Sequence, residues 1–171
     1  MKIGLLSDSH GNIQYVKKAA EYLKKANVSL IVHLGDDCED LDAVKNLGVE
    51  VVKVPGVFSS CYQDQSIPNR VIKEIDGVKI LITHSSQPHP NDLPEDKDPK
   101  DIIEQENIKA VFYGHTHIPK IENKNGILWI NPGHLRESDK KGNPATFAIV
   151  EIKDGMASGK IIKYSDVIHN D

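Results

Sequence analysis

The chain has few cysteines and no long apolar run, and each shortage excludes a class of protein. Its 171 residues contain two cysteines, Cys38 and Cys61, which are too few for a disulfide framework and fit free thiols in a reducing compartment. No stretch approaches the ~20 apolar residues of a membrane span, and the N-terminal run at 3–6 is too short for the core of a signal peptide. The sequence therefore predicts a cytoplasmic protein without membrane contact.

The charge balance argues against a general nucleic-acid or membrane surface. The formal net charge is −4, whereas such surfaces need a clustered basic excess. An anionic substrate would therefore need a local source of positive charge, such as a bound metal ion. With 39% apolar and 27% charged residues, the composition is that of an ordinary globular protein. The length fits a single domain over residues 1–171.

Apolar runs alternate with helical patterns along the chain. We expect strands at 2–6, 30–34, 49–54, 70–75, 78–82, 110–113, 118–122, 127–130, 146–152 and 160–164. Helical spacing predicts helices from Ile13 until Asn27 closes the pattern, at about 39–47, and from Pro99 to about 107, with Asn12 as an N-cap. Residues 59–69 and 85–100 are predicted to be loops. The second is long and rich in proline, and it is a candidate lid over a site.

Residues that can bind metal ions follow directly on several of these strands. Gly114-His115-Thr116-His117 comes after the apolar run at 110–113. The glycine lets the backbone turn sharply, and side chains two residues apart in extended chain point the same way. The other strand ends carry Asp8 and His10, Asp36, His84 and Asn131. Because ligands bind beyond the carboxyl ends of strands in an open α/β sheet, we expect one cluster, whose carboxylates and imidazoles suit Mn²⁺, Fe²⁺, Zn²⁺ or Ni²⁺.

These ordered motifs, with Gly35-Asp36 and Asn131-Pro132-Gly133, resemble the calcineurin-like metallophosphoesterase superfamily in its small bacterial and archaeal phosphodiesterase branch. The resemblance covers almost the whole chain. It implies an α/β fold, a four-layer αββα sandwich of two mixed sheets flanked by helices, with a dinuclear metal centre at one edge. By the family pattern the first ion would be held by Asp8, His10 and His117, Asp36 would bridge, and the second ion would be held by His84 and His115.

The resemblance also implies an activity, the metal-dependent hydrolysis of a small phosphoester, and a phosphodiester in particular. A hydroxide that bridges two divalent ions, with Mn²⁺ expected, would attack phosphorus in line. The catalytic residues implied are Asp36, His84 and His115. Asn131 is expected to orient the site through hydrogen bonds. His134 and Arg136 follow the Asn-Pro-Gly turn, and the sequence leaves open whether they contact substrate, support the site or lie at the surface.

One departure from the family pattern weakens the second metal site. Family members carry Gly-Asn after the third strand, where this chain has Gly56-Val57, and valine cannot coordinate a metal ion. The residue that would follow and assist the leaving group is also missing. Candidate replacement ligands are Cys61, Asp64 and Asp37. A centre with only the first ion bound is therefore one alternative, and a non-catalytic scaffold with a partly degenerate metal site, resembling the retromer subunit of this branch, is another.

The remaining histidines have plainer expected roles. His33 lies inside a strand and is predicted to be a buried, hydrogen-bonded side chain and not a ligand. His89 lies in the 85–100 loop, where the sequence leaves open surface exposure or contact with substrate. No specific role is expected for His169 near the C-terminus, and both cysteines are expected to be unreactive. The sequence also leaves open whether the chain forms a homodimer.

Overall fold

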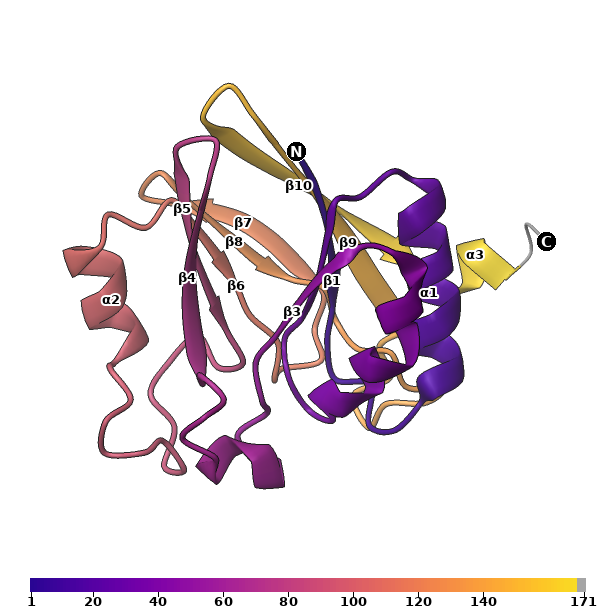
Figure 1. Ribbon diagram of the computed structural model, residues 1–171, viewed down its shortest axis with the longest axis horizontal. Coiled ribbons are helices and arrows are strands. Elements are labelled where there is room, and N and C mark those ends of the chain that lie inside the picture. Colours follow the sequence, from indigo (N-terminus) through magenta and orange to yellow (C-terminus); the bar gives the residue numbers. More distant parts are fainter. Residues whose placement is uncertain (169–171) are drawn as a thin grey trace.

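Two five-stranded mixed sheets pack face to face and enclose the central core (Figure 1). The computed structural model describes residues 1–168, apart from the side chains of Cys38 and Ile168, so the predictions for His169 and for the Cys38 thiol lie outside the described residues. The first sheet has the order β10-β9-β1-β2-β3. Its strands are β1 (Lys2–Leu6), β2 (Leu30–His33), β3 (Glu50–Lys53), β9 (Thr146–Lys153) and β10 (Met156–Lys163).

The second sheet has the order β4-β5-β6-β8-β7. Its strands are β4 (Arg70–Ile75), β5 (Val78–Thr83), β6 (Ala110–Phe112), β7 (Lys120–Lys124) and β8 (Ile127–Asn131). Aliphatic and aromatic residues on the inner faces pack between the sheets; Ile3, Val32, Ile80 and Phe112 are fully buried there. Burial of this apolar surface is the main favourable contribution to folding.

Helices cover the outer face of each sheet and complete the four-layer αββα sandwich that the sequence predicts (Figure 1). The first sheet is covered by α1 (Ile13–Lys25), by the 3₁₀ helix η1 (Cys38–Leu47) and by α3 (Ser165–Ile168), and the second by α2 (Pro99–Gln105). Asn12 caps α1 by accepting a hydrogen bond from the Tyr15 N–H at 3.3 Å, as predicted. No helix within residues 1–168 is both long enough and apolar enough to span a membrane.

Four elements differ from the sequence prediction in type, in existence or by more than two residues at one end. The 39–47 segment is a 3₁₀ helix because its apolar residues, Leu41, Val44 and Leu47, recur every three residues, which is the 3₁₀ repeat. A second short helix, η2 (Ser60–Gln63), and α3 lie in segments where no helix was expected. Strand β10 begins at Met156, four residues early, because pairing with β9 orders a stretch that has no apolar alternation.

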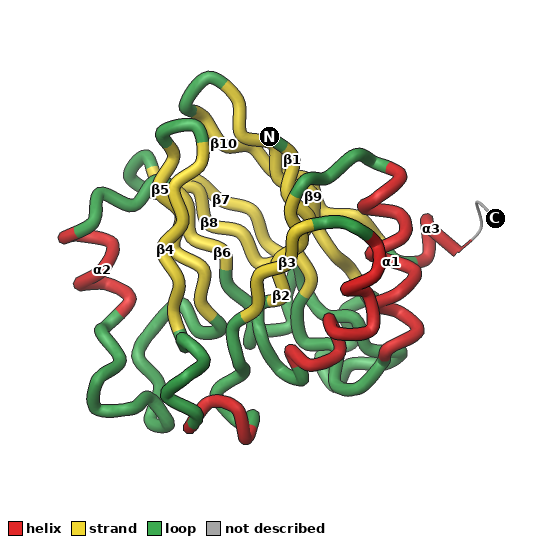
Figure 2. The backbone as a smooth tube through the Cα atoms, viewed as in Figure 1, coloured by secondary structure: helices red, strands yellow, loops and turns green. Residues whose placement is uncertain are grey.

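The direction of the strands brings the site together. Strands β1, β2 and β3 run parallel in the first sheet, and β5, β6 and β8 run parallel in the second. Figure 2 shows the loops that follow these strands gathered along the lower edge of both sheets. Every predicted metal ligand lies in one of these loops.

Candidate metal centre

Four predicted ligands converge on one point at this edge. Each of them places one ligand atom within 4.8 Å of the others; the four are Asp8, His10, Asp36 and His117. His117 Nε2 lies 3.3 Å from Asp8 Oδ1 and 3.3 Å from His10 Nε2. The carboxylates follow strands of the first sheet, whereas His117 follows β6 of the second. Two sheets thus contribute to one set of ligands.

The other two predicted ligands form a second group beside the first. His84 Nε2 and His115 Nδ1 lie 3.2 Å apart. Asp36 connects the two groups, because its Oδ2 lies 3.5 Å from His10 Nε2 and its Oδ1 lies 3.5 Å from His84 Nε2. The structure therefore brings all six predicted metal ligands together, with Asp36 between the two halves.

The environment of Asp8 fits a bound cation. This carboxylate is fully buried, and Oδ1 has no hydrogen-bond partner among the described residues, whereas Oδ2 accepts hydrogen bonds from the Ser7 hydroxyl and from the His115 N–H at 3.1 Å. Burial raises the pKa of Asp8, but the neighbouring imidazoles of His117 and His84 outweigh it and lower the pKa overall. A buried anionic oxygen surrounded by imidazole nitrogens suits a divalent metal ion.

Most of the predicted ligands have a strained backbone conformation. Five of the six ligands have a positive φ, between 49° and 66°: Asp8, His10, Asp36, His115 and His117. Non-glycine residues rarely adopt this conformation, and where it persists it clusters at functional sites. The backbone is also closely packed at Gly114, where a Cβ would lie 2.0 Å from Ser7 Oγ and 2.8 Å from Asp8 Oδ2. The glycine before the two histidines is thus required for close approach.

Hydrogen bonds fix which ring nitrogen of His84 and of His117 is available to a metal ion. His84 Nδ1 lies 2.7 Å from the Leu34 carbonyl oxygen, so this nitrogen carries the proton and Nε2 keeps its lone pair. His117 Nδ1 lies 2.8 Å from Asp139 Oδ1 in the same way. Burial lowers the pKa of His115, and the neighbouring His84 lowers it further, so this ring is neutral at physiological pH.

Asp139 is a functional residue that the sequence reasoning missed. It lies in an irregular loop among lysines, 22 residues after His117, and no motif marks it. Burial raises the pKa of Asp139, but hydrogen bonds from His117 and from the Lys141 N–H lower it to about 2. The carboxylate is therefore charged at neutral pH and holds the His117 ring in place.

The three residues predicted around the site take distinct positions. The Asn131 side chain donates to the Gly114 carbonyl at 2.7 Å and to Thr116 Oγ1 at 3.0 Å, so it is bonded to the loop that carries His115 and His117. His134 is fully buried; Nε2 faces the Asn143 carbonyl and Nδ1 accepts from the Arg136 N–H, which leaves no ring nitrogen for a substrate. Arg136 lines an open, largely polar cavity of about 400 Å³ beside His10.

No proposed replacement ligand has a described contact with the second group of ligands. Cys61 donates to Glu39, and Asp64 accepts from Ser66. Asp37 is exposed at the start of η1. Val57 is buried, and its carbonyl accepts from the Asn91 side chain at 2.9 Å.

His33 is fully buried, as predicted. Its Nε2 lies 2.9 Å from Ser9 Oγ, and its Nδ1 accepts from the Gly35 N–H at 3.3 Å. Both ring nitrogens are thus occupied within the protein, which agrees with the predicted structural role.

Comparison with known proteins identifies the family and agrees with the fold. The calcineurin-like phosphoesterase superfamily domain matches residues 1–155, and the chain belongs to this superfamily. Phosphodiesterase MJ0936 of Methanocaldococcus jannaschii is 29% identical over 146 residues, covering 78% of this chain and 83% of that protein. The probable metallophosphoesterase MJ0623 of the same organism is 33% identical over 137 residues, covering 78% of this chain and 67% of that protein.

Solved structures share the fold. An archaeal phosphodiesterase superposes with a TM-score of 0.73 at 24% identity, covering 95% of this chain and all of that one. Vps29 of Entamoeba histolytica in complex with zinc superposes with a TM-score of 0.67 at 21% identity, covering 96% of this chain and 99% of that one. At these identities the likeness supports the architecture alone.

Proposed function

We propose that this protein is a metal-dependent phosphodiesterase that hydrolyses a small phosphoester at a dinuclear centre, with Mn²⁺ as the working ion. The observation that carries the proposal is the position of Asp36, whose two carboxylate oxygens each lie 3.5 Å from a histidine Nε2, one in each half of the site. A carboxylate shared in this way suits two cations about 3.5 to 4 Å apart. The named activity of the archaeal relative supports a phosphodiester over a monoester.

The residues divide into three roles. Asp8, His10 and His117 would hold one ion, His84 and His115 would hold the other, and Asp36 would lie between them. Bound divalent ions supply a nucleophilic hydroxide at neutral pH and neutralise charge on the phosphoryl oxygens.

The other residues orient the ligands and the substrate. The Leu34 carbonyl and Asp139 hold two imidazoles with Nε2 free. Arg136, in the cavity beside His10, is placed to bind a phosphoryl oxygen with its planar guanidinium. Phosphoryl transfer depends mainly on this positioning and on charge stabilisation.

The test combines metal content with hydrolysis of bis(p-nitrophenyl) phosphate by protein purified without chelator and assayed with added Mn²⁺. We expect two ions per chain and turnover in the wild type, and loss of turnover in Asp36→Ala. Asp154→Ala is a matched control, because Asp154 has a similar φ of 53° but lies in the β9–β10 turn. Undiminished turnover in a folded Asp36→Ala variant would refute the proposal. Wild-type protein without metal or turnover would favour the scaffold alternative.

A further inference from the structure

The 85–98 loop places a further histidine, His89, beside the weakened half of the metal centre. The ring of His89 lies edge to face with that of His115, with centroids 5.4 Å apart and planes inclined at 77°. On its other side the ring contacts Phe58, at 5.3 Å and 88°. Phe58 is 72% exposed and follows Val57, the residue that stands where the family has a metal ligand. His89 therefore lies at the solvent-facing rim of the His84–His115 pair.

A hydrogen bond from the backbone fixes the tautomer of the His89 ring. The Asn91 N–H donates to His89 Nδ1 at 3.1 Å. A backbone N–H can only donate, so Nδ1 must keep its lone pair, and the neutral ring carries its proton on Nε2. No hydrogen bond to Nε2 from elsewhere in residues 1–168 is present.

The result is the reverse of the arrangement in His84. There Nδ1 carries the proton, toward the Leu34 carbonyl, and Nε2 is free to coordinate a metal ion. His89 instead presents an N–H group, which cannot coordinate a metal ion. The ring does not replace the missing ligand at Val57; it adds a hydrogen-bond donor beside the site.

The loop that carries His89 is held firmly although it has no helix or strand. Asp92 accepts from the His89 N–H at 3.0 Å, from the Tyr62 hydroxyl at 2.6 Å and from Arg70 Nη2 at 2.7 Å, and the Arg70 side chain is only 6% exposed. The Asn91 side chain donates to the Val57 carbonyl. These contacts fix the donor before a substrate arrives.

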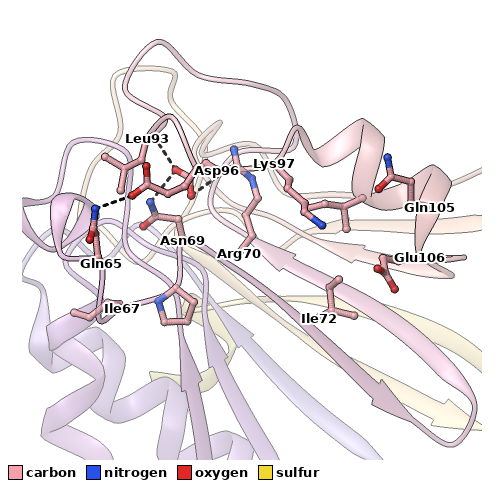
Figure 3. Close-up of a pocket in the computed structure, with 13 residues that line it drawn as sticks. Gln65, Ile67, Asn69, Arg70, Ile72, Leu93, Asp96, Lys97, Gln105 and Glu106 are labelled. Carbon is pink, nitrogen blue, oxygen red and sulfur yellow. Dashed lines mark hydrogen bonds and ion pairs between the residues drawn. The ribbon is translucent and has the colours of Figure 1, made fainter.

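Further along the same loop, Asp96 is held in a similar way. Figure 3 shows Asn69 and Arg70 lying against Asp96 at the wall of a cavity. Asn69 Nδ2 donates to Asp96 Oδ2 at 2.9 Å, and the cavity has a volume of about 330 Å³. The loop is thus attached at two points after His89, Asp92 and Asp96, to Arg70 at the start of β4 and to Asn69 just before it.

We propose that His89 donates a hydrogen bond from Nε2 to a phosphoryl oxygen of the substrate on the His84–His115 side of the centre. Phe58 stands where, by the family resemblance, a residue that assists the leaving group would follow the asparagine, so His89 would supply a donor on the side of the site where that residue is missing. The inference rests on the proposed phosphodiesterase function. Such a hydrogen bond becomes stronger as negative charge develops on the phosphoryl oxygen in the transition state. Removal of the donor should therefore lower kcat/KM by about 10- to 100-fold.

Two substitutions at His89 distinguish the effect of the N–H donor from the effect of the aromatic ring. His89→Phe keeps an aromatic ring against Phe58 and His115 but has no N–H, and His89→Gln keeps an amide N–H. We expect His89→Phe to lower kcat/KM for bis(p-nitrophenyl) phosphate by about 10- to 100-fold with unchanged Mn²⁺ affinity, and His89→Gln to recover part of the loss. Gln87→Ala, at an exposed side chain of the same loop, is the control and should match the wild type.

A second measurement separates this inference from the proposed function. The affinity of the Mn²⁺-loaded protein for inorganic phosphate, measured by calorimetry, should fall in His89→Phe and recover in His89→Gln, even if the wild type hydrolyses no diester. Wild-type values in His89→Phe for both turnover and phosphate affinity would overturn the assignment. A fall in Mn²⁺ affinity would also overturn it, because His89 would then act on the metal ion and not on the substrate.

Discussion

Removal of the Asp139 carboxylate should weaken metal binding without unfolding the protein. Its Oδ1 lies 2.8 Å from His117 Nδ1, and the side chain is 3% exposed, so no water takes its place easily. In Asp139→Ala the His117 ring can rotate, and its proton can move to Nε2, the nitrogen that faces Asp8. A partner of this kind is typically worth 10- to 100-fold in metal affinity, or about 1.4 to 2.8 kcal/mol.

The assay is calorimetric titration of Mn²⁺ into chelator-stripped protein, with a thermal melt to show that each variant is folded. Glu137→Ala is the matched control, because it removes an exposed carboxylate from the same loop. Asp139→Asn should lie between the wild type and Asp139→Ala, since the amide oxygen still accepts a hydrogen bond but carries no charge. If Asp139→Ala and Glu137→Ala bind Mn²⁺ equally well, Asp139 does not orient His117, and the reasoning fails.

Three further predictions follow from single residues. In Gly56→Ala the new Cβ would lie 1.9 Å from Asp36 Oδ1, so metal content per chain should fall; full occupancy would show that the loop can shift. In Val57→Asn a ligand is restored, so Mn²⁺ stoichiometry or turnover should rise; no change in either would mean that the second site is already complete. Burial lowers the pKa of His33 from 6.5 to about 4, so the unfolded chain binds a proton there that the folded protein excludes, and the free energy of unfolding should fall by up to about 3 kcal/mol as the pH drops from 6.5 to 4. Urea unfolding should show a smaller fall in His33→Gln, and an equal fall would exclude His33 as its source.

The fold and the clustering of the candidate metal ligands could be predicted because their signals are local. Each ligand lies within four residues of an apolar run, and glycines mark the turns at Gly35, Gly56 and Gly114. Parallel strands then bring their carboxyl ends to one edge, which needs no knowledge of loop paths. A helix at about 39–47 was predicted without its type, and the three-residue spacing of Leu41, Val44 and Leu47 that accompanies the 3₁₀ form is visible in the sequence.

The contacts of Asp139 and His89 could not be predicted, because they depend on how irregular loops return to the site. Asp139 reaches His117 from a segment without pattern, and the protonation of His89 is set by a backbone N–H two residues away. A histidine in a proline-rich loop carries no sign of which nitrogen will be occupied. The single domain over 1–171, the cytoplasmic location and the homodimer stay predictions.

The division of the ligands between the two sheets has a mechanical consequence. Asp8 and Asp36 follow strands of the first sheet, and His84, His115 and His117 follow strands of the second. A metal ion held by these residues would therefore cross-link the two sheets at this edge, and any motion that separates the sheets there would also have to break metal–ligand bonds. Occupancy of the site and rigidity of the scaffold would then rise and fall together, since a ligand that binds only the closed state stabilises it by mass action.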